Sequence, residues 1–338
     1  MIHGIYNPFE MNRRQFLSAS LAGMAASITD PLHAAKPKKK ARISITLDLE
    51  MSRHYPSREI MEWDYQKGNL NEPTKKYSLE AAKIAKEHGG LIHYFCVGRV
   101  LEQKDINWLK QIHEMGHPIG NHTYDHVNIW TKDPQKTQFR FSRSPWLVKG
   151  MTAEQIIRQN IRITTLAMKQ RLGFTPDGFR SPGGSYLGLD DREDIQQIIL
   201  DEGFSWISSR YPQHGNSKRG EGPDQEVYDS IVNAMKIAQP NVYPTGLIEI
   251  PMSPISDVGA FRSSSWKLEQ FLKSIELCIE WAIENDGIFD FLCHPSIMYV
   301  EDPGFETVKF ICDLVKKSNG KAEIVSLDSI ARDYLKQK

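Results

Sequence analysis

Short apolar runs alternate with amphipathic segments along the chain from residue 42 onward. The apolar runs are rich in β-branched and aromatic residues and are bounded by Gly, Pro or polar residues, which predicts strands. These are expected at 42–49, 91–97, 118–120, 177–180, 205–208, 247–251, 288–293 and 322–325. Between them, apolar residues recur every three or four positions, which predicts helices at 78–88, 105–115, 152–172, 190–202, 266–285 and 306–317. Strands that alternate with helices predict an α/β fold with a parallel sheet, and this number of strands favours a barrel.

Two long segments interrupt this alternation, residues 127–150 and residues 211–245. The first carries Trp130 and Trp146. Loops of this length in a compact domain usually line or cover a binding site. The sequence shows no internal repeat and no second domain boundary, so we expect one catalytic domain over residues 42–338.

The first 35 residues differ from the rest of the chain. The pair Arg13-Arg14 precedes a weakly apolar run at 16–28, and two small residues, Ala34 and Ala35, follow it. This run is too short to span a bilayer, whereas the paired arginines are typical of a twin-arginine export signal. An amphipathic or buried N-terminal helix is the alternative. We therefore predict an exported, periplasmic or extracellular protein without a stable membrane span, in which residues 1–35 are the signal and residues 36–41 a basic linker.

The charges of the chain balance, with 42 basic and 42 acidic side chains. A balanced chain has no overall field that would attract a nucleic acid or an anionic membrane, so neither is an expected partner. The cysteines, at 96, 278, 293 and 312, lack the spacing of a metal or redox motif and are expected to be buried thiols. The composition favours a neutral or modest-sized ligand, and it does not indicate an oligomeric state.

A zinc-protease spacing, His113-Glu114-x-x-His117, lies in the middle of the chain. That site requires both histidines on one uninterrupted helix. Gly116 and Pro118 instead form a typical helix end. We therefore expect His113 and His117 on different elements, which disfavours a protease.

His122 and His126 form a second pair, four residues apart with no helix breaker between them. On a helical turn, this spacing would present two imidazoles to one metal ion. A surface pair or a capping feature is the ordinary alternative. The pair therefore needs partners from other strands before it indicates a metal site.

Polar residues at the ends of other expected strands could supply those partners. Asp48 and Glu50 lie two residues apart at the end of the first strand, so they face the same side of an extended chain. Arg180 follows another strand and can hold a carboxylate, and the glycines after it allow a substrate to approach the backbone. His294 ends the apolar run 288–293. Each residue could be a simple cap or turn residue, but the carboxyl ends of parallel strands are also where ligands bind.

Taken in order, these motifs resemble those of the polysaccharide deacetylases of carbohydrate esterase family 4, over most of residues 42–328. The family's T-F-D-D motif looks like TLDLE at 46–50, and its H-[ST]-x-x-H motif is matched by HTYDH at 122–126. Its R-x-P-x-G motif is matched by RSPGG at 180–184, and its L-x-H motif by LCH at 292–294.

This resemblance implies a distorted (β/α) barrel of about seven strands that hydrolyses N-acetyl, or O-acetyl, groups on an extracytoplasmic polysaccharide or oligosaccharide. The partner would be an N-acetylated glycan. The cofactor would be a divalent metal, commonly zinc. The implied metal ligands are Glu50, His122 and His126; the implied catalytic residues are Asp48 as base, His294 as acid and Arg180, which orients Asp48; and the implied substrate contacts are Pro182, Gly184 and Trp206.

Two positions depart from the family pattern. Leu49 stands where the metal-binding second aspartate is usual, so Glu50 must take that role. Ile207, in the stretch GFSWISS, replaces the aspartate of the fourth motif. If His294 needs a carboxylate partner, Glu249 and Asp257 are the candidates by placement.

Two other functions stay open at this point. Relatives with an acid two residues after the first aspartate open small cyclic amides such as allantoin or cyclic imides, although those enzymes are typically cytoplasmic. A catalytically impaired glycan-binding protein on the same scaffold is the other alternative. The presence of both histidines, Arg180 and His294 favours an active enzyme over a pure binder.

Overall fold

The computed structural model describes residues 39–60, 67–176 and 178–336. The predicted export signal and residues 36–38 of the predicted linker lie outside the described residues. The end of that linker is strand, because Ala41 already belongs to β1. Among the described helices, none combines the length and the apolar character that crossing a membrane requires.

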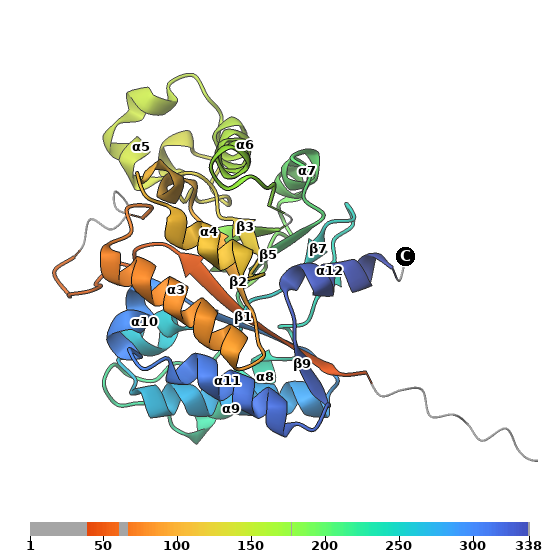
Figure 1. Ribbon diagram of the computed structural model, residues 1–338. Helices are drawn as coiled ribbons and strands as arrows, with labels where there is room; N and C mark the ends of the chain where they lie inside the picture. The colour runs from red at the N-terminus through yellow and green to blue at the C-terminus, as the bar shows by residue number, and fades with distance from the viewer. Residues whose placement is uncertain (1–38, 61–66, 177, 337–338) are drawn as a thin grey trace, which may run out of the picture. The chain divides into compact units, whose positions relative to one another are not determined.

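A curled, mostly parallel sheet forms the centre of the described chain (Figure 1). Its strands follow the order β6-β7-β5-β4-β3-β2-β1-β8, and β9 pairs with the first residues of β1. Only the short β6–β7 pair is antiparallel among the described pairings. The strands are β1 (Ala41–Leu49), β2 (Ile92–Cys96), β3 (Ile119–Asn121), β4 (Phe179–Ser185), β5 (Trp206–Arg210), β6 (Asn241–Val242), β7 (Ile248–Glu249), β8 (Ile288–Cys293) and β9 (Ala322–Ile324). The α/β class with a parallel sheet is confirmed.

The sheet does not close through regular strand pairing. In the described chain, β7 and β8 share no ladder, and the segment after β7 bridges them instead. The backbone N–H of Ser253 donates to the carbonyl of Asp290, 2.8 Å away. The Ser253 hydroxyl in turn accepts a bond from the N–H of Leu292. The predicted distorted (β/α) barrel is therefore confirmed, and its distortion lies between β7 and β8.

Strand β1 lies between β2 and β8 and is buried along most of its length. Its apolar side chains, such as Ile45, Leu47 and Leu49, belong to the main hydrophobic cluster under the helices. The alternate side chains Thr46 and Asp48 point to the other face, where they meet polar partners inside the barrel. The period of two therefore carries Asp48 into the interior at the carboxyl end of the strand.

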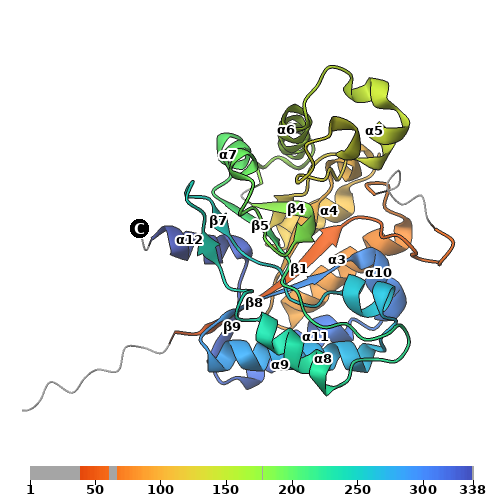
Figure 2. The same cartoon turned by 180° about the vertical axis from the view of Figure 1, so that it is seen from behind.

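Helices cover the outer side of the sheet (Figures 1 and 2). Contacts run from α8 to α9, α11, α3 and α4, which is the outer layer of a (β/α) barrel. The helices are α3 (Glu72–Glu87), α4 (Asn107–Glu114), α5 (Phe139–Arg143), α6 (Ala153–Leu172), α7 (Glu193–Asp201), α8 (Gln225–Ala234), α9 (Leu268–Glu284), α10 (Pro295–Glu301), α11 (Glu306–Lys317) and α12 (Leu327–Leu335), with short helical segments η1 (Gly98–Glu102), η2 (Pro134–Lys136), η3 (Pro145–Val148) and the π-helical η4 (Val258–Ser263).

All the expected helices are present, but some of the expected boundaries and loops are wrong: the segment 127–150 contains α5 and two short helical segments, and β4 continues to Ser185. Helix α3 begins at Glu72, six residues before the expected start at Ser78, because Asn71 caps it and Pro73 fits its first turn. Residues 211–245 are not one loop, since they contain α8, capped by Asp224, and β6. The four cysteines are free and buried, as expected.

The end of the barrel at the strand N-termini is filled by apolar side chains. Trp206, Ile248 and Ile288 stand at the first residues of their strands and form a cluster with Leu327 and Ile330 of α12. This end is a packed core. The polar residues lie at the opposite end of the barrel, where the strands have their carboxyl ends.

Candidate active site

Five of the predicted metal-binding and catalytic residues line one cavity of about 380 Å³: Asp48, Glu50, His122, His126 and His294. They come from the carboxyl ends of β1, β3 and β8. Glycines after Arg180 in β4 form part of the wall, and residues 211–216 and η4 complete it. Because every element reaches the cavity from the same end of the sheet, the site lies where ligands bind in parallel α/β folds.

The end of β1 supplies two carboxylates to this cavity. Asp48 and Glu50 both line it, as expected for residues two apart. Leu49 between them is fully buried in the main hydrophobic cluster. The alternation of the strand therefore directs position 49 into the core, and Glu50 is the second acid that faces the cavity.

The loop after β3 holds the two histidines, and it is not the helical turn that the spacing predicts. Thr123 and His126 have φ angles of 57° and 58°, in the left-handed region that non-glycine residues rarely adopt. The side chain of Asn121 accepts a bond from Thr123 N, and the Thr123 hydroxyl accepts one from Val127 N. These local bonds replace a helical ladder and fix the loop. Two histidines four residues apart thus converge through a sharply bent loop.

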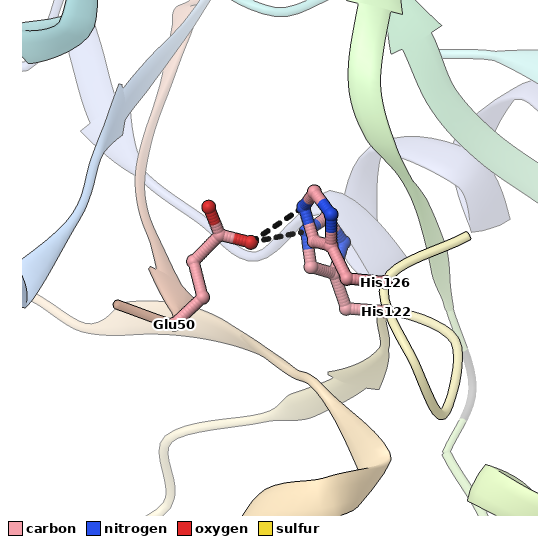
Figure 3. Close-up of side chains that lie close together, drawn as sticks. All are labelled: Glu50, His122 and His126. Atoms are coloured by element: carbon pink, nitrogen blue, oxygen red, sulfur yellow. Dashed lines mark ion pairs between the residues drawn. The ribbon is translucent and has the colours of Figure 1, made fainter. Parts of the chain in front are cut away.

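Glu50, His122 and His126 point toward one another (Figure 3). The Oε2 atom of Glu50 lies 2.6 Å from Nε2 of His126 and 3.4 Å from Nε2 of His122. Two donors on one tetrahedral zinc ion are about 3.3 Å apart, so this donor set fits such an ion. The Nδ1–H of His122 donates to the Arg180 carbonyl at 2.9 Å, which leaves its Nε2 lone pair facing Glu50.

The protonation states in this cluster also suit a metal site. Burial lowers the pKa of His126 to about 4, so its imidazole is neutral at neutral pH. Burial alone would raise the pKa of the Glu50 carboxyl, but a hydrogen bond from His126 and the charge of Lys67 hold it well below its ordinary value. Neutral imidazole and ionised carboxylate are the forms that ligate divalent metals. The Lys67 ammonium pairs with the other oxygen of Glu50, Oε1.

Arg180 is fully buried beneath Asp48. Its Nη1 donates to Asp48 Oδ1 at 3.2 Å and to the Thr46 hydroxyl at 2.7 Å. Its Nη2 donates to Asp290 and, at 3.2 Å, to Ser208. A planar guanidinium with both ends bound fixes the orientation of the Asp48 carboxylate.

His294 follows the last residue of β8 and directly precedes α10. Its Nδ1 lies 2.9 Å from Asp257 Oδ1, and Asp257 Oδ2 accepts its backbone N–H at 2.5 Å. Burial alone would lower the pKa of His294, but Asp257 and then Glu50 raise it above its ordinary value. Glu249, the other candidate partner, instead binds Ser209 in the core. Asp257 is therefore the carboxylate partner of His294, which Ile207 cannot provide.

The zinc-protease motif is divided between two elements, as expected. His113 is an exposed residue of α4 and stacks on Phe174, with ring centroids 3.9 Å apart. His117 follows the helix, and its Nδ1 accepts the backbone N–H of Ile92 at 2.9 Å. Gly116 ends the helix with a φ of +94°. The two histidines serve different structural contacts.

The three residues predicted to contact the substrate lie in different places. Gly184 lines the cavity, and a Cβ there would lie 2.7 Å from Tyr211 and 2.8 Å from Met252, so only glycine fits. Pro182 lines a second hollow that shares His126 and Gly184 with the cavity. Trp206 lines neither, and its Nε1 donates to Asp328 at the opposite end of the barrel. The predicted substrate contact of Trp206 is wrong. Its ring is buried in the hydrophobic core, because residue 206 is the first residue of β5 and not the last.

Several residues of the site carry no motif in the sequence. Lys67, His214 and Arg262 line the cavity from segments that sequence patterns leave as connections. Trp130 and Phe139 line the second hollow from the long segment 127–150. The length of that segment and its aromatic residues were the signal for them.

Comparison with known proteins agrees with this site. Residues 64–192, which include the histidine loop and the Arg180 segment, match the polysaccharide deacetylase family model. Over these residues the chain is similar to the polysaccharide deacetylases. This family hydrolyses carbon–nitrogen bonds other than peptide bonds, and the chain is assigned to that class of enzyme.

Solved structures share the fold of this chain. A protein named as a polysaccharide deacetylase from Mycobacterium smegmatis is 15% identical with a TM-score of 0.58, over 89% of this chain and 92% of that one. One from Pseudomonas aeruginosa PAO1 is 13% identical with a TM-score of 0.58, over 88% and 91%. The Puue allantoinase is 14% identical with a TM-score of 0.53, over 90% and 93%. No curated protein matches the sequence.

Proposed function

We propose that this chain is a divalent metal-dependent deacetylase that removes N-acetyl, or O-acetyl, groups from an extracytoplasmic glycan. The observation that carries the proposal is the convergence of Glu50, His122 and His126, as one set of ligand atoms within 4.8 Å of one another, beside Asp48 and His294. Zinc is a metal that a two-histidine, one-carboxylate set can hold.

The chemistry follows from the residues around this set. When bound, the metal polarises the acetyl carbonyl and lowers the pKa of water. Asp48, held by Arg180, takes the proton from the attacking water. His294, with Nδ1 on Asp257, presents Nε2 and gives the proton that the departing amine or alcohol needs. The buried Arg180–Asp290 pair keeps the base in place.

The glycan would extend from the cavity into the second hollow, which is lined in part by Trp130, Phe139 and Pro182. The two spaces share His126, Gly183 and Gly184, so a chain of sugars could pass over the glycines. Aromatic and glycine surfaces suit flat sugar faces. Export of the chain, predicted from residues 13–35, would bring it to such a polymer.

Acetate release from N-acetylglucosamine oligomers tests the proposal. We expect release by the full chain, its loss after chelator treatment and its recovery with zinc. Asp48→Asn should abolish release, whereas the exposed Asp313→Asn on α11 should not. Activity that persists after complete metal removal would refute the metal role.

A ring-opening hydrolase of small cyclic amides is the second candidate. Glu50 in place of the usual aspartate and a cavity of about 380 Å³, the size of a small-molecule site, favour it. The same base and acid would serve, because both substrates are amides. Ring opening of allantoin or a cyclic imide without any acetate release would reverse the order of the two candidates.

A further inference from the structure

A lysine stands inside the metal-ligand cluster. The Nζ of Lys67 pairs with Glu50 Oε1, while Oε2 of the same carboxylate faces His122 and His126. Both partners of the pair are almost fully buried, with side chains 4% exposed. The deacetylase motifs do not include this residue, and it lies in the segment that leads to α3.

The backbone fixes Lys67 in this position. Its carbonyl accepts the N–H of Met51, the residue that directly follows Glu50. The neighbouring Gly68 passes so close to Arg99 that a Cβ would lie 2.3 Å from the Arg99 Cβ. These two contacts, at the carbonyl of Lys67 and at the residue that follows it, hold this part of the backbone beside the end of β1.

The cavity needs a positive charge when no metal is bound. Asp48 and Glu50 both line it and are buried, and Arg180 is already bound to Asp48 and Asp290. A buried carboxylate without a cationic partner is costly. Lys67 supplies that partner at Oε1 of Glu50, which His294 Nε2 also approaches at 3.6 Å, while Oε2 faces His122 and His126.

We propose that Lys67 is a resident cation of the active site, which stabilises the metal-free enzyme and weakens the binding of a divalent ion. An ammonium on one oxygen of Glu50 repels a dication on the other, and burial strengthens that repulsion. The inference rests on the proposed role of Glu50 as a metal ligand. It predicts an enzyme that folds without metal and binds zinc less tightly than its ligands alone would allow.

Zinc affinity of the metal-free full chain tests the inference, measured by competition with a chromophoric chelator. We expect Lys67→Met to bind zinc about tenfold tighter or more than the natural chain. Lys67→Arg keeps the charge and should stay within about threefold. Lys83→Met removes an exposed lysine paired with Glu80 on α3 and should leave the affinity unchanged.

Thermal unfolding gives a second readout. Lys67→Met should lower the Tm of the metal-free protein, because Glu50 loses its partner, and zinc should restore it. If this variant folds only with zinc, its affinity is measured by removing zinc with graded chelator. Equal or weaker zinc binding by Lys67→Met would overturn the inference and leave Lys67 as a residue that positions Glu50.

Failure of the inference is distinct from failure of the proposed function. If neither the natural chain nor Lys67→Met binds zinc, the resident-cation inference is wrong. Acetate release by the natural chain, measured separately with and without chelator, then decides whether the deacetylase proposal survives without its metal.

Discussion

Asp257 holds His294 by two bonds at once, one to its ring and one to its backbone. The Nδ1 atom lies 2.9 Å from Oδ1, and the backbone N–H donates to Oδ2 at 2.5 Å. The carboxylate is completely buried and comes from the segment between β7 and η4. One side chain thus sets both the ring orientation of His294 and the charge behind it.

Asp257→Asn should weaken catalysis and change its pH dependence. Asp257 raises the pKa of His294, so the amide should lower it. A general acid must be protonated, and activity is lost as pH rises through its pKa. The descending limb of kcat should therefore move to lower pH, with kcat reduced by about 10- to 100-fold. The pH profile of acetate release measures both effects.

Glu249→Gln is the matched control, since Glu249 is also fully buried but binds Ser209 and Tyr243. The descending limb of its kcat profile should stay at the same pH as in the natural chain. An unchanged limb in Asp257→Asn would show that His294 is not the group that titrates there.

The two overlapping histidine pairs give an internal comparison. His122→Ala and His126→Ala each remove a donor from the Glu50 cluster, so zinc content should fall with activity. We expect a loss larger than the 10- to 100-fold that outer-shell changes cause. Zinc per chain, measured by mass spectrometry, and acetate release are the measurements.

His113→Ala is the control from the neighbouring motif, because His113 is exposed and its ring stacks on Phe174. It should keep both zinc and activity. Loss of zinc in His113→Ala with retention in His122→Ala would reverse our assignment of the metal site.

Strand periodicity made part of this site predictable. Side chains alternate between the two faces of a strand, which predicted that Asp48 and Glu50 face the same side at the end of β1. The apolar run 288–293 coincides with β8. These predictions succeed because a buried strand has only two faces, and an error of one residue would bury a charge. The carboxyl ends of parallel strands then bring the residues together.

Other parts depend on contacts between distant segments. The spacing of His122 and His126 fits a helical turn, but Asn121 and Thr123 stabilise a bent loop instead. Motif alignment placed Trp206 on a strand without giving its end of the barrel. Lys67 carries no local signal at all, because its role exists only after the chain folds against Glu50.

Leu49→Asp, which restores the family's usual acid, should destabilise the fold without adding a metal ligand. Leu49 is fully buried in the main apolar cluster, on the opposite side of β1 from the cavity. A carboxylate there lacks a partner and should lower the free energy of unfolding by at least about 3 kcal/mol. Chemical denaturation measures this loss. Leu49→Met keeps the volume and should cost less than about 1.5 kcal/mol.

The double variant Leu49→Asp with Glu50→Ala sharpens the same point. We expect it to lack bound zinc, because the new carboxylate faces the helices. Zinc binding by a folded double variant would mean that β1 can supply its ligand from position 49.

Phe139→Ala should distinguish a polymer substrate from a small one. Phe139 lines the second hollow and is 39% exposed, so its truncation should cost little stability. Loss of an aromatic contact worth about 0.5–1.5 kcal/mol corresponds to about a 2- to 12-fold rise in KM. That rise should occur for N-acetylglucosamine tetramers and not for the monosaccharide, whose acetyl group needs only the cavity. Leu166→Ala, an exposed apolar residue on α6 outside both hollows, is the control and should change neither KM. Equal effects of Phe139→Ala on monomer and tetramer, or none on either, would argue that no sugar binds beyond the cavity and would favour the small cyclic amide as substrate.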